Sequence, residues 1–544
     1  MNNLDQYNDK FSSLNYRYME DDVYNRYPSP ELEIETPPFQ DKSWQYTRNR
    51  DDIFHGVIDV NVQDYSTEEK ALVRKIDLLV LPIVCTLDFL QFLDKSTINY
   101  AALMSFKTDL NLQGSQYSLL GTMFYLGYFV YQLPNNFLLQ CIPIARYIGA
   151  LVILWGLVLL CTAFVTNFSQ VAALRFLLGF FEAGIYPCLT LLISTFYRRA
   201  EQVIRLGAFW ICNGFALFTG GLVAYGIGHM TNIAGLKAWQ WLMIILGSAT
   251  ILMGIITFFF LIDTPKSPAL QLNAEQELLV EERTKDNATV RTTEIKREQI
   301  MEAIKEVRFW CYSFACLLIN LQNGAMTIYN GQIAQNFGFN VRNPAQLTKY
   351  FMLIYIYLWQ QLQSMLLTAG AGGSTVIFIV IAIVAVRKTQ QTIYTACTLT
   401  AVNIIGLILL LVIPITHIKL IGFYLAWSYC SVYVLLITSV SNNVTGYTKK
   451  IFYNGVLMLF YTIGNAVGPL MMVRPPFIEG MLGYLVANCL VFVLFLVARW
   501  RMAVANSRRL LLMGHSSNVN MVPAHTYVQE DISDEQDQSF IYIL

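Results

Sequence analysis

Charged residues are scarce in this sequence. Only 14% of its 544 residues are Asp, Glu, Lys or Arg, whereas soluble proteins carry about 25%. Hydrophobic residues make up 55%, and the mean hydropathy is +0.45. This balance excludes an ordinary soluble protein and indicates a polytopic membrane protein. Because 37 basic and 37 acidic residues cancel, no basic surface for nucleic acid stands out.

Motifs for catalysis and metal binding are also missing. Most of the ten cysteines lie singly in apolar segments, as Cys85, Cys188 and Cys316 do. They indicate small hydrophobic residues and neither a disulfide framework nor a CxxC metal site. No Walker loop, zinc motif or nucleophile elbow occurs, and the polar N-terminus shows no signal peptide. We therefore expect no enzyme, no metal and no cofactor.

Twelve apolar segments dominate the rest of the chain, each about as long as a helix that crosses a hydrocarbon core of about 30 Å. They lie near 77–98, 117–139, 147–166, 170–195, 205–228, 239–262, 309–332, 371–387, 392–414, 418–441, 451–472 and 480–500. The pattern predicts an all-α polytopic membrane protein with twelve transmembrane helices in two six-helix halves around a midplane cavity. The predicted units are a disordered N-terminal tail (1–70), a first half (71–262), a central loop (263–307), a second half (308–500) and a C-terminal tail (501–544).

Basic residues predict the orientation in the membrane. They cluster before the first segment, after the fourth and at one end of several later segments, as Lys70, Arg74, Lys75, Arg198, Arg199, Arg205, Arg387, Lys388, Lys449, Lys450, Arg499 and Arg501. Lysine and arginine are enriched on the cytoplasmic side. We therefore expect the central loop and both termini to be cytoplasmic.

The apolar stretch 346–368 does not fit the count of twelve. It precedes the glycine-rich sequence Gly370–Gly373, and a single helix from 346 through Arg387 would exceed about 60 Å. We predict an interfacial helix followed by a separate eighth span. A long, tilted eighth span is the alternative.

Arg175 and Glu182 are seven residues apart within one apolar segment. Seven residues are two helical turns, so both side chains lie on one face. A charge at membrane depth costs about 2.5–3.5 kcal/mol on insertion scales, and such groups usually face a bundle interior or a wet cavity. We interpret this face as part of a substrate or proton pathway. A buried structural ion pair is the alternative.

The first apolar segment carries three ionisable residues, Asp88, Asp94 and Lys95. Asp88 and Lys95 are seven residues apart and share a face, and Asp94 is adjacent to Lys95. Ionisable groups inside a membrane span indicate a functional site. Alternatively, Asp94 and Lys95 lie at the outer interface, with the lysine reaching toward water.

Amides and phenols in other segments add candidate substrate contacts. They are Tyr128 and Gln132 in the second segment, Asn213 in the fifth, Asn320 and Asn323 in the seventh, and Asn454 and Asn465 in the eleventh. Such groups can orient a small polar solute in a mostly apolar site. Hydrogen bonding between helices explains each of them equally well.

Several of these motifs resemble those of one family. They are Leu90–Lys95, Arg175–Gly184 with Pro187, Asp263–Pro268, Asn287–Thr289, Ser441–Lys450, Tyr461, Gly464–Asn465, Gly468–Pro469, Asp531–Gln536 and Phe540–Leu544. With them the chain resembles the fungal allantoate permease family, anion:cation symporters of the major facilitator superfamily. The likeness runs from about Lys75 to Leu544.

The resemblance implies the major facilitator fold and a secondary active transporter. It implies import of a small organic anion or related nutrient, such as allantoate, ureidosuccinate, a carboxylate, a vitamin or a sulfur compound, by proton-coupled symport and alternating access. Carried over to this chain, Asp94, Lys95, Arg175 and Glu182 serve coupling. We expect Asp94 and Glu182 to take up the proton, and Lys95 and Arg175 to bind the anionic substrate. The expected partners are the anionic substrate, protons and the lipid bilayer, and we expect a monomer in the plasma membrane.

The sequence departs from the family pattern in places. Asp88 stands where an aromatic or aliphatic residue is usual, so we expect it to affect specificity, or to be a buried protonated acid with little effect. Gln132 and Asn135 alter a Glu-x-Pro-Ser-Asn pattern. A non-transporting nutrient sensor (transceptor) on the same fold is the alternative function, and uptake against a gradient separates the two.

Overall fold

The computed structural model describes residues 67–197, 199–230, 233–273, 275–280, 296–335, 351–413, 415–515, 532–537 and 540–544. The predicted disordered tail therefore lies outside the described residues, except for its last four. The described secondary structure is helical apart from one isolated bridge between Ile233 and Leu236. The prediction of an all-α protein is confirmed.

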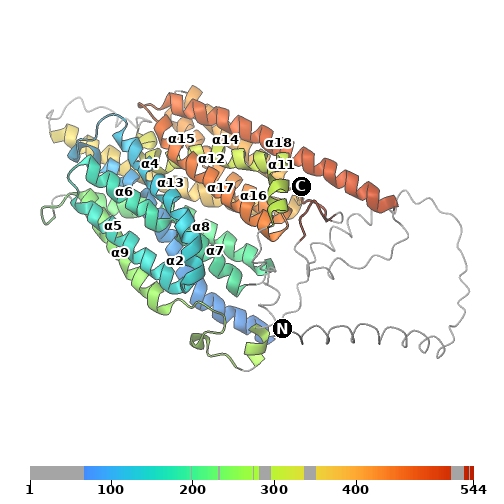
Figure 1. Ribbon diagram of the computed structural model, residues 1–544. Coiled ribbons are helices and arrows are strands. Elements are labelled where there is room, and N and C mark those ends of the chain that lie inside the picture. The colour runs from blue at the N-terminus through green and yellow to red at the C-terminus, as the bar shows by residue number, and fades with distance from the viewer. Residues whose placement is uncertain are drawn as a thin grey trace, which may run out of the picture. The chain divides into compact units, whose positions relative to one another are not determined.

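The helices of the first half follow the predicted apolar segments (Figure 1). They are α2 (Thr67–Leu103), the short α3 (Phe106–Asp109), α4 (Gln116–Cys141), α5 (Ile144–Cys161), α6 (Phe168–Glu182), α7 (Ile185–Phe196), α8 (Arg199–Gly228) and α9 (Ala238–Phe260). The predicted fourth span is made of α6 and α7, which meet directly after Glu182. This break leaves the end of α6, with its glutamate, inside the bundle.

The second half begins after a short helix of the central loop, α11 (Arg297–Lys305). Its helices are α12 (Val307–Gln335), α13 (Phe351–Thr389), α14 (Thr392–Val412), α15 (Thr416–Ala426), α16 (Tyr429–Asn443), α17 (Tyr447–Val467) and α18 (Ile478–His515). Helix α18 runs well past the predicted end of the last span at residue 500. We call the end of the bundle at which α2 begins the inner end, and the end at which α3 leads to α4 the outer end.

Ten helical segments of the described residues are long and apolar enough to cross a membrane. Helices α4 and α12 are not among them, although they coincide with predicted spans. Both carry polar side chains, such as Gln132 on α4 and Gln322 on α12. Gln322 is fully buried between Asn403 and Asn488. It exchanges hydrogen bonds of 3.0 and 3.1 Å with Asn403 and accepts one of 2.8 Å from Asn488. Such buried amides lower the hydropathy of a helix that packs against other helices, so the count of twelve spans remains a prediction.

Residues 346–350 of the predicted interfacial helix at 346–368 lie outside the described residues, and for the rest the predicted break before the eighth span is wrong. Residues Phe351–Thr389 form one continuous helix, α13, which at 39 residues is about 58 Å long. Gly370 and Gly372 lie within this continuous helix and do not break it. Each allows a neighbouring helix to pack closely against α13. A side-chain carbon at Gly372 would lie 2.3 Å from the main-chain nitrogen of Phe218 on α8. Gly372 thus lets α13 of the second half touch the backbone of α8 of the first, whereas Gly370 packs against the ring of Tyr424 on α15.

Replacing Gly372 tests this contact. We expect Gly372→Ala to push α8 and α13 apart and to lower the free energy of unfolding by about 1–3 kcal/mol, as overpacking does. The adjacent Gly373 has no atom within 4 Å of the added carbon, so Gly373→Ala is the matched control and should have little effect. The measurement is the apparent unfolding temperature of the purified protein in detergent. Equal shifts for the two variants would contradict the close contact.

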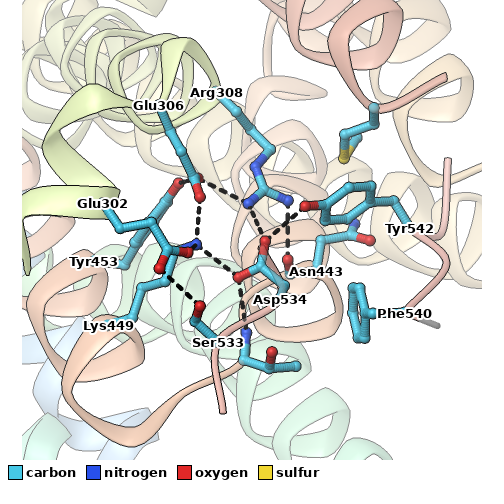
Figure 2. A network of polar contacts seen from close by, with 12 residues as sticks. Glu302, Glu306, Arg308, Asn443, Lys449, Tyr453, Ser533, Asp534, Phe540 and Tyr542 are labelled. Atoms are coloured by element: carbon cyan, nitrogen blue, oxygen red, sulfur yellow. Dashed lines mark hydrogen bonds and ion pairs between the residues drawn. The ribbon is translucent and has the colours of Figure 1, made fainter. Parts of the chain in front are cut away.

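The C-terminal residues return to the inner end of the second half (Figure 2). The carboxylate of Asp534 pairs with Arg308 Nη2 at 2.6 Å and with Lys449 Nζ at 2.8 Å. The Asn443 side chain bonds the main chain of Ile543 in both directions, at 2.7 and 2.9 Å. The main-chain nitrogen of Thr392 donates to the carbonyl of Leu544. The tail therefore joins the ends of four helices, α12, α14, α16 and α17.

Three carboxylates, those of Glu302, Glu306 and Asp534, lie close enough together in this network to suggest a metal site. The ammonium of Lys449 lies among them and pairs with all three. It supplies the positive charge that a metal would bring. The cluster is therefore a built-in ion-pair network in which α11, α17 and the tail meet.

Candidate functional site

A cavity lies between the two halves of the bundle. It encloses about 950 Å³ of space free of atoms, counted to its open mouth. The first half contributes Asp88, Gln91, Phe92, Lys95, Tyr128, Tyr186, Trp210, Asn213 and Leu217. The second half contributes Asn320, Asn323, Thr327, Thr375, Ile379, Trp427, Tyr429, Cys430, Tyr433, Val434, Met458 and Tyr461. Both halves therefore line one site.

Hydrogen bonds between the halves gather on the outer side of this cavity. They join Asn99 to Gly331 (2.8 Å), Lys107 to Gln332 (2.5 Å), Tyr117 to Ile328 (2.9 Å), Ser118 to Tyr329 (2.6 Å) and Thr122 to Ala466 (2.8 Å). Burial lowers the pKa of Lys107, which lies beyond the end of α2, to about 8. The two halves are thus fastened together by polar contacts at the outer end.

The charged centre of the cavity wall is an ion pair between α2 and the end of α6. Lys95 Nζ lies 3.0 Å from Glu182 Oε1. The Glu182 side chain is completely buried, and that of Lys95 is 13% exposed toward the cavity. The ammonium also lies 5.4 Å from the centre of the Phe124 ring. The alternative in which Lys95 reaches out to the membrane interface is therefore wrong.

Arg175 lies behind the wall, two turns before Glu182 on α6. It is 3% exposed and does not line the cavity. Its guanidinium donates a long hydrogen bond of 3.4 Å to the Thr97 hydroxyl. The predicted shared face is confirmed, because Arg175 and Glu182 both turn toward α2. Within the described residues, however, the ion pair of Glu182 is with Lys95 and not with Arg175.

Asp94 also lies away from the cavity. Its carboxylate accepts hydrogen bonds from Trp155 Nε1 (2.9 Å) on α5 and from the Thr250 hydroxyl (2.7 Å) on α9. It is fully buried among these helices of the first half. Adjacent residues on a helix point in directions about 100° apart, which is why Lys95 meets the cavity and Asp94 does not.

An amide cluster from α12 and α17 forms part of the opposite wall. Asn323 donates to the side-chain oxygen of Asn465 at 2.8 Å, and Asn465 donates to that of Asn320 at 3.1 Å. The Tyr429 hydroxyl donates to Asn323 at 3.0 Å. Asn320 and Asn323 line the cavity, whereas Asn465 is buried behind them. These mutual bonds fix the orientation of the amides.

The structure brings six of the predicted residues together on the cavity wall, namely Asp88, Lys95, Tyr128, Asn213, Asn320 and Asn323. Glu182 and Asn465 contact this group from behind.

Asn454 is exposed, so its prediction as a wall residue is wrong. It shares a helical face with Met458 and Tyr461 but lies nearer the inner end, beyond the cavity. Gln132, one turn past Tyr128 toward the same end, is half-buried and also off the wall.

Most of the aromatic rings on the wall were not predicted from the sequence, which singled out only Tyr128 and Tyr461 among them. Trp210 lies 5.6 Å from the ring centre of Tyr186 and 5.6 Å from that of Tyr433, and Tyr433 lies 5.7 Å from Tyr461. These four residues come from α7, α8, α16 and α17. The sequence gives little signal for them, because aromatic residues of membrane helices also face lipid. We call Tyr186, Trp210, Tyr433 and Tyr461 the aromatic row.

Comparisons with known proteins agree with this architecture. A family described as Major Facilitator Superfamily matches residues 84–469. An uncharacterized transporter of Schizosaccharomyces pombe is 30% identical over 450 residues, which cover 81% of this chain and 86% of that protein. The allantoate permease of Saccharomyces cerevisiae is 27% identical and covers 74% of this chain and 73% of that protein.

A solved structure shares the fold. It is that of a bacterial homolog of the human lysosomal transporter Spinster in an inward-facing, occupied conformation. The two structures superpose with a TM-score of 0.56 at 12% identity, over 77% of this chain and 96% of the other. At this identity the likeness concerns the fold alone.

Proposed function

This chain belongs to the Major Facilitator Superfamily of membrane transporters, as its resemblance to the fungal allantoate permeases predicted, and from that premise we propose that it is a proton-coupled symporter. It imports a small organic anion or a related nutrient by alternating access of one cavity. The observation that carries the proposal is the buried ion pair of Lys95 and Glu182 on the cavity wall.

The ion pair can couple a proton to an anion by an exchange of partners. When Glu182 takes up a proton, its negative charge disappears and the Lys95 ammonium loses its counter-ion. A buried, unpaired charge costs several kcal/mol, so binding of an anionic substrate group to Lys95 becomes favourable. When the substrate leaves, Lys95 again favours the charged form of Glu182, and the proton is released. Anion and proton therefore cross together.

The remaining predicted residues support this exchange from other positions. We propose Asp94 as a second proton site and Arg175 as a second cation for the substrate, each reached in another conformation of the cycle. Tyr128, Asn213, Asn320 and Asn323 would orient the polar groups of the substrate at the wall. Their mixture of donors and acceptors suits a small metabolite in a mostly apolar site.

We further propose that the protein acts as a monomer in the plasma membrane with both termini in the cytoplasm. The basic residues that end several spans at the inner end support this orientation. With this orientation, the hydrogen bonds between the halves close the side of the cavity that faces away from the cytoplasm. The substrate site of this conformation therefore faces the cytoplasm.

Uptake in cells that lack their own permeases tests the proposal. Growth on single nitrogen, sulfur and vitamin sources identifies a substrate, and its radiolabelled form measures accumulation. We expect concentrative uptake that rises several-fold as the external pH falls from 7 to 5 and that collapses with a protonophore. Accumulation that ignores the protonophore would contradict proton coupling. A response to the nutrient without accumulation would identify a sensor instead.

A further inference from the structure

Asp88 brings a second ionisable group, a carboxyl group, to the cavity. Its side chain is 2% exposed, and its Oδ2 atom has no hydrogen-bond partner in the described part of the chain. Among the described residues that line the cavity, Asp88 is the one with a carboxyl group, because Glu182 lies behind Lys95. A buried, ionised carboxylate without a partner is destabilising unless it takes up a proton or a ligand supplies a positive charge.

Lys95 is not available as that partner. Its ammonium is engaged by Glu182 at 3.0 Å. Asp88 lies seven residues before Lys95 on the same face of α2, which places the two backbone positions about 10 Å apart. The cavity therefore presents a positive group and a negative group two helical turns from each other, toward opposite ends of α2.

The aromatic row supplies a second feature that suits a cation. Its four rings form a continuous line across both halves, with centre-to-centre distances of 5.6–5.7 Å. The faces of such rings attract cations that lie within about 6 Å. Asp88, Tyr186 and Trp210 all line the cavity from the first half. A carboxylate beside aromatic rings is a common arrangement for an organic ammonium or a heteroaromatic cation.

We propose that the cavity has a cation subsite, formed by Asp88 and the aromatic row, and that the substrate is zwitterionic. Its positively charged nitrogen group would bind Asp88, and its anionic group would bind Lys95. The anionic end rests on the proposed function, whereas the cation subsite rests on the geometry of Asp88. Asp88 is thus a specificity-determining residue that selects against simple anions.

Charged thiol reagents test the cation subsite without a known substrate. Cys430 lines the cavity, so a full-length protein that keeps only this cysteine reports on the local potential. We would compare its rates of modification by methanethiosulfonate ethylammonium, a cation, and methanethiosulfonate ethylsulfonate, an anion. We expect Asp88→Asn to lower the cation-to-anion rate ratio about a hundredfold, because the loss of one charge about 10 Å away at an effective dielectric constant near 20 slows the cation and speeds the anion by about tenfold each. Asn213→Cys offers a second reporter position on the facing half.

Glu479→Gln is the matched control, because Glu479 is an exposed carboxylate outside the cavity and its loss should leave the ratio unchanged. An unchanged ratio in Asp88→Asn at both reporter positions would overturn the proposal and identify Asp88 as a neutral, structural acid. The readout needs no transport. Failure of proton-coupled uptake with a lowered ratio would therefore refute the symport mechanism and leave the cation subsite standing.

Discussion

Concentrative uptake is expected to disappear in Glu182→Gln, while exchange of preloaded substrate persists. Glutamine has the shape of the protonated acid but cannot release a proton. In this variant Lys95 loses its partner at 3.0 Å and stays free for an anion in every step of the cycle. The substrate can then bind and cross, but no proton gradient drives it. We expect accumulation to fall to the background of cells without the protein, and counterflow to remain within several-fold of wild type.

Two further variants make this measurement specific. Glu182→Asp keeps a carboxylate and should retain part of the pH-driven uptake.

Asp94→Asn removes the neighbouring acid, which accepts hydrogen bonds from Trp155 and Thr250 away from the cavity. If Asp94 is a second proton site, this variant also keeps exchange and loses accumulation. If Asp94 only holds α5 and α9, the variant lowers the amount of folded protein and uptake together. Surface levels must be measured for all variants, and pH-driven accumulation by Glu182→Gln would contradict the assignment of the proton site.

The sequence predicted the charged faces because helical periodicity is local. Seven-residue spacing placed Asp88 with Lys95, and Arg175 with Glu182, before any fold was known. It could not predict that Glu182 pairs with Lys95, because that choice depends on the angle and height at which α6 crosses α2. The ion pair joins residues 87 positions apart in the chain. Only the packing of the helices decides which acid meets which base.

Glycine and aromatic residues were less informative because each has two common uses in membrane helices. Gly370 and Gly372 suggested a break, but in α13 they permit close packing, Gly370 against Tyr424 and Gly372 against the backbone of α8. Tyr186 and Tyr433 face the cavity, although the sequence does not distinguish them from aromatic residues that face lipid. The prediction for Asn454 failed for a third reason. Asn454 lies on the face of α17 that lines the cavity, but the cavity does not extend as far along the helix as this residue. The periodicity of a sequence shows which face of a helix a residue occupies, but it does not show how deep in the bundle the residue lies.

The second large effect is expected at the C-terminus, where Asp534→Asn should detach the tail from the second half. Asp534 and Lys449 are completely buried and Arg308 is 5% exposed, so these ion pairs are shielded from water (Figure 2). Removing one partner of a buried ion pair costs about 3–5 kcal/mol. We expect a loss near the lower limit, because Glu306 still pairs with Arg308 and Lys449. The measurement is the apparent unfolding temperature of the purified protein.

The dependence of this stabilisation on pH follows from the pKa of Asp534. Burial alone would raise the pKa of this carboxyl, but Arg308 and Lys449 outweigh burial and hold it below its ordinary value of 3.8. An acid with a depressed pKa stabilises the fold above its ordinary pKa, and the contribution is lost as the pH falls through the folded value. The difference between wild type and Asp534→Asn should therefore be complete at pH 7 and should shrink only in strong acid.

Glu535 provides the matched control for this prediction. It follows Asp534 directly but is exposed, and burial together with repulsion by Glu302 and Glu306 raises its pKa. Because the negative charge of Glu535 is repelled by those of Glu302 and Glu306, Glu535→Gln should leave the unfolding temperature unchanged or raise it slightly. A cysteine at Ser533, which is completely buried, should become accessible to an impermeant thiol reagent in Asp534→Asn and stay protected in Glu535→Gln. Equal protection in both variants would mean that Asn443 and the C-terminal main chain hold the tail without its carboxylate.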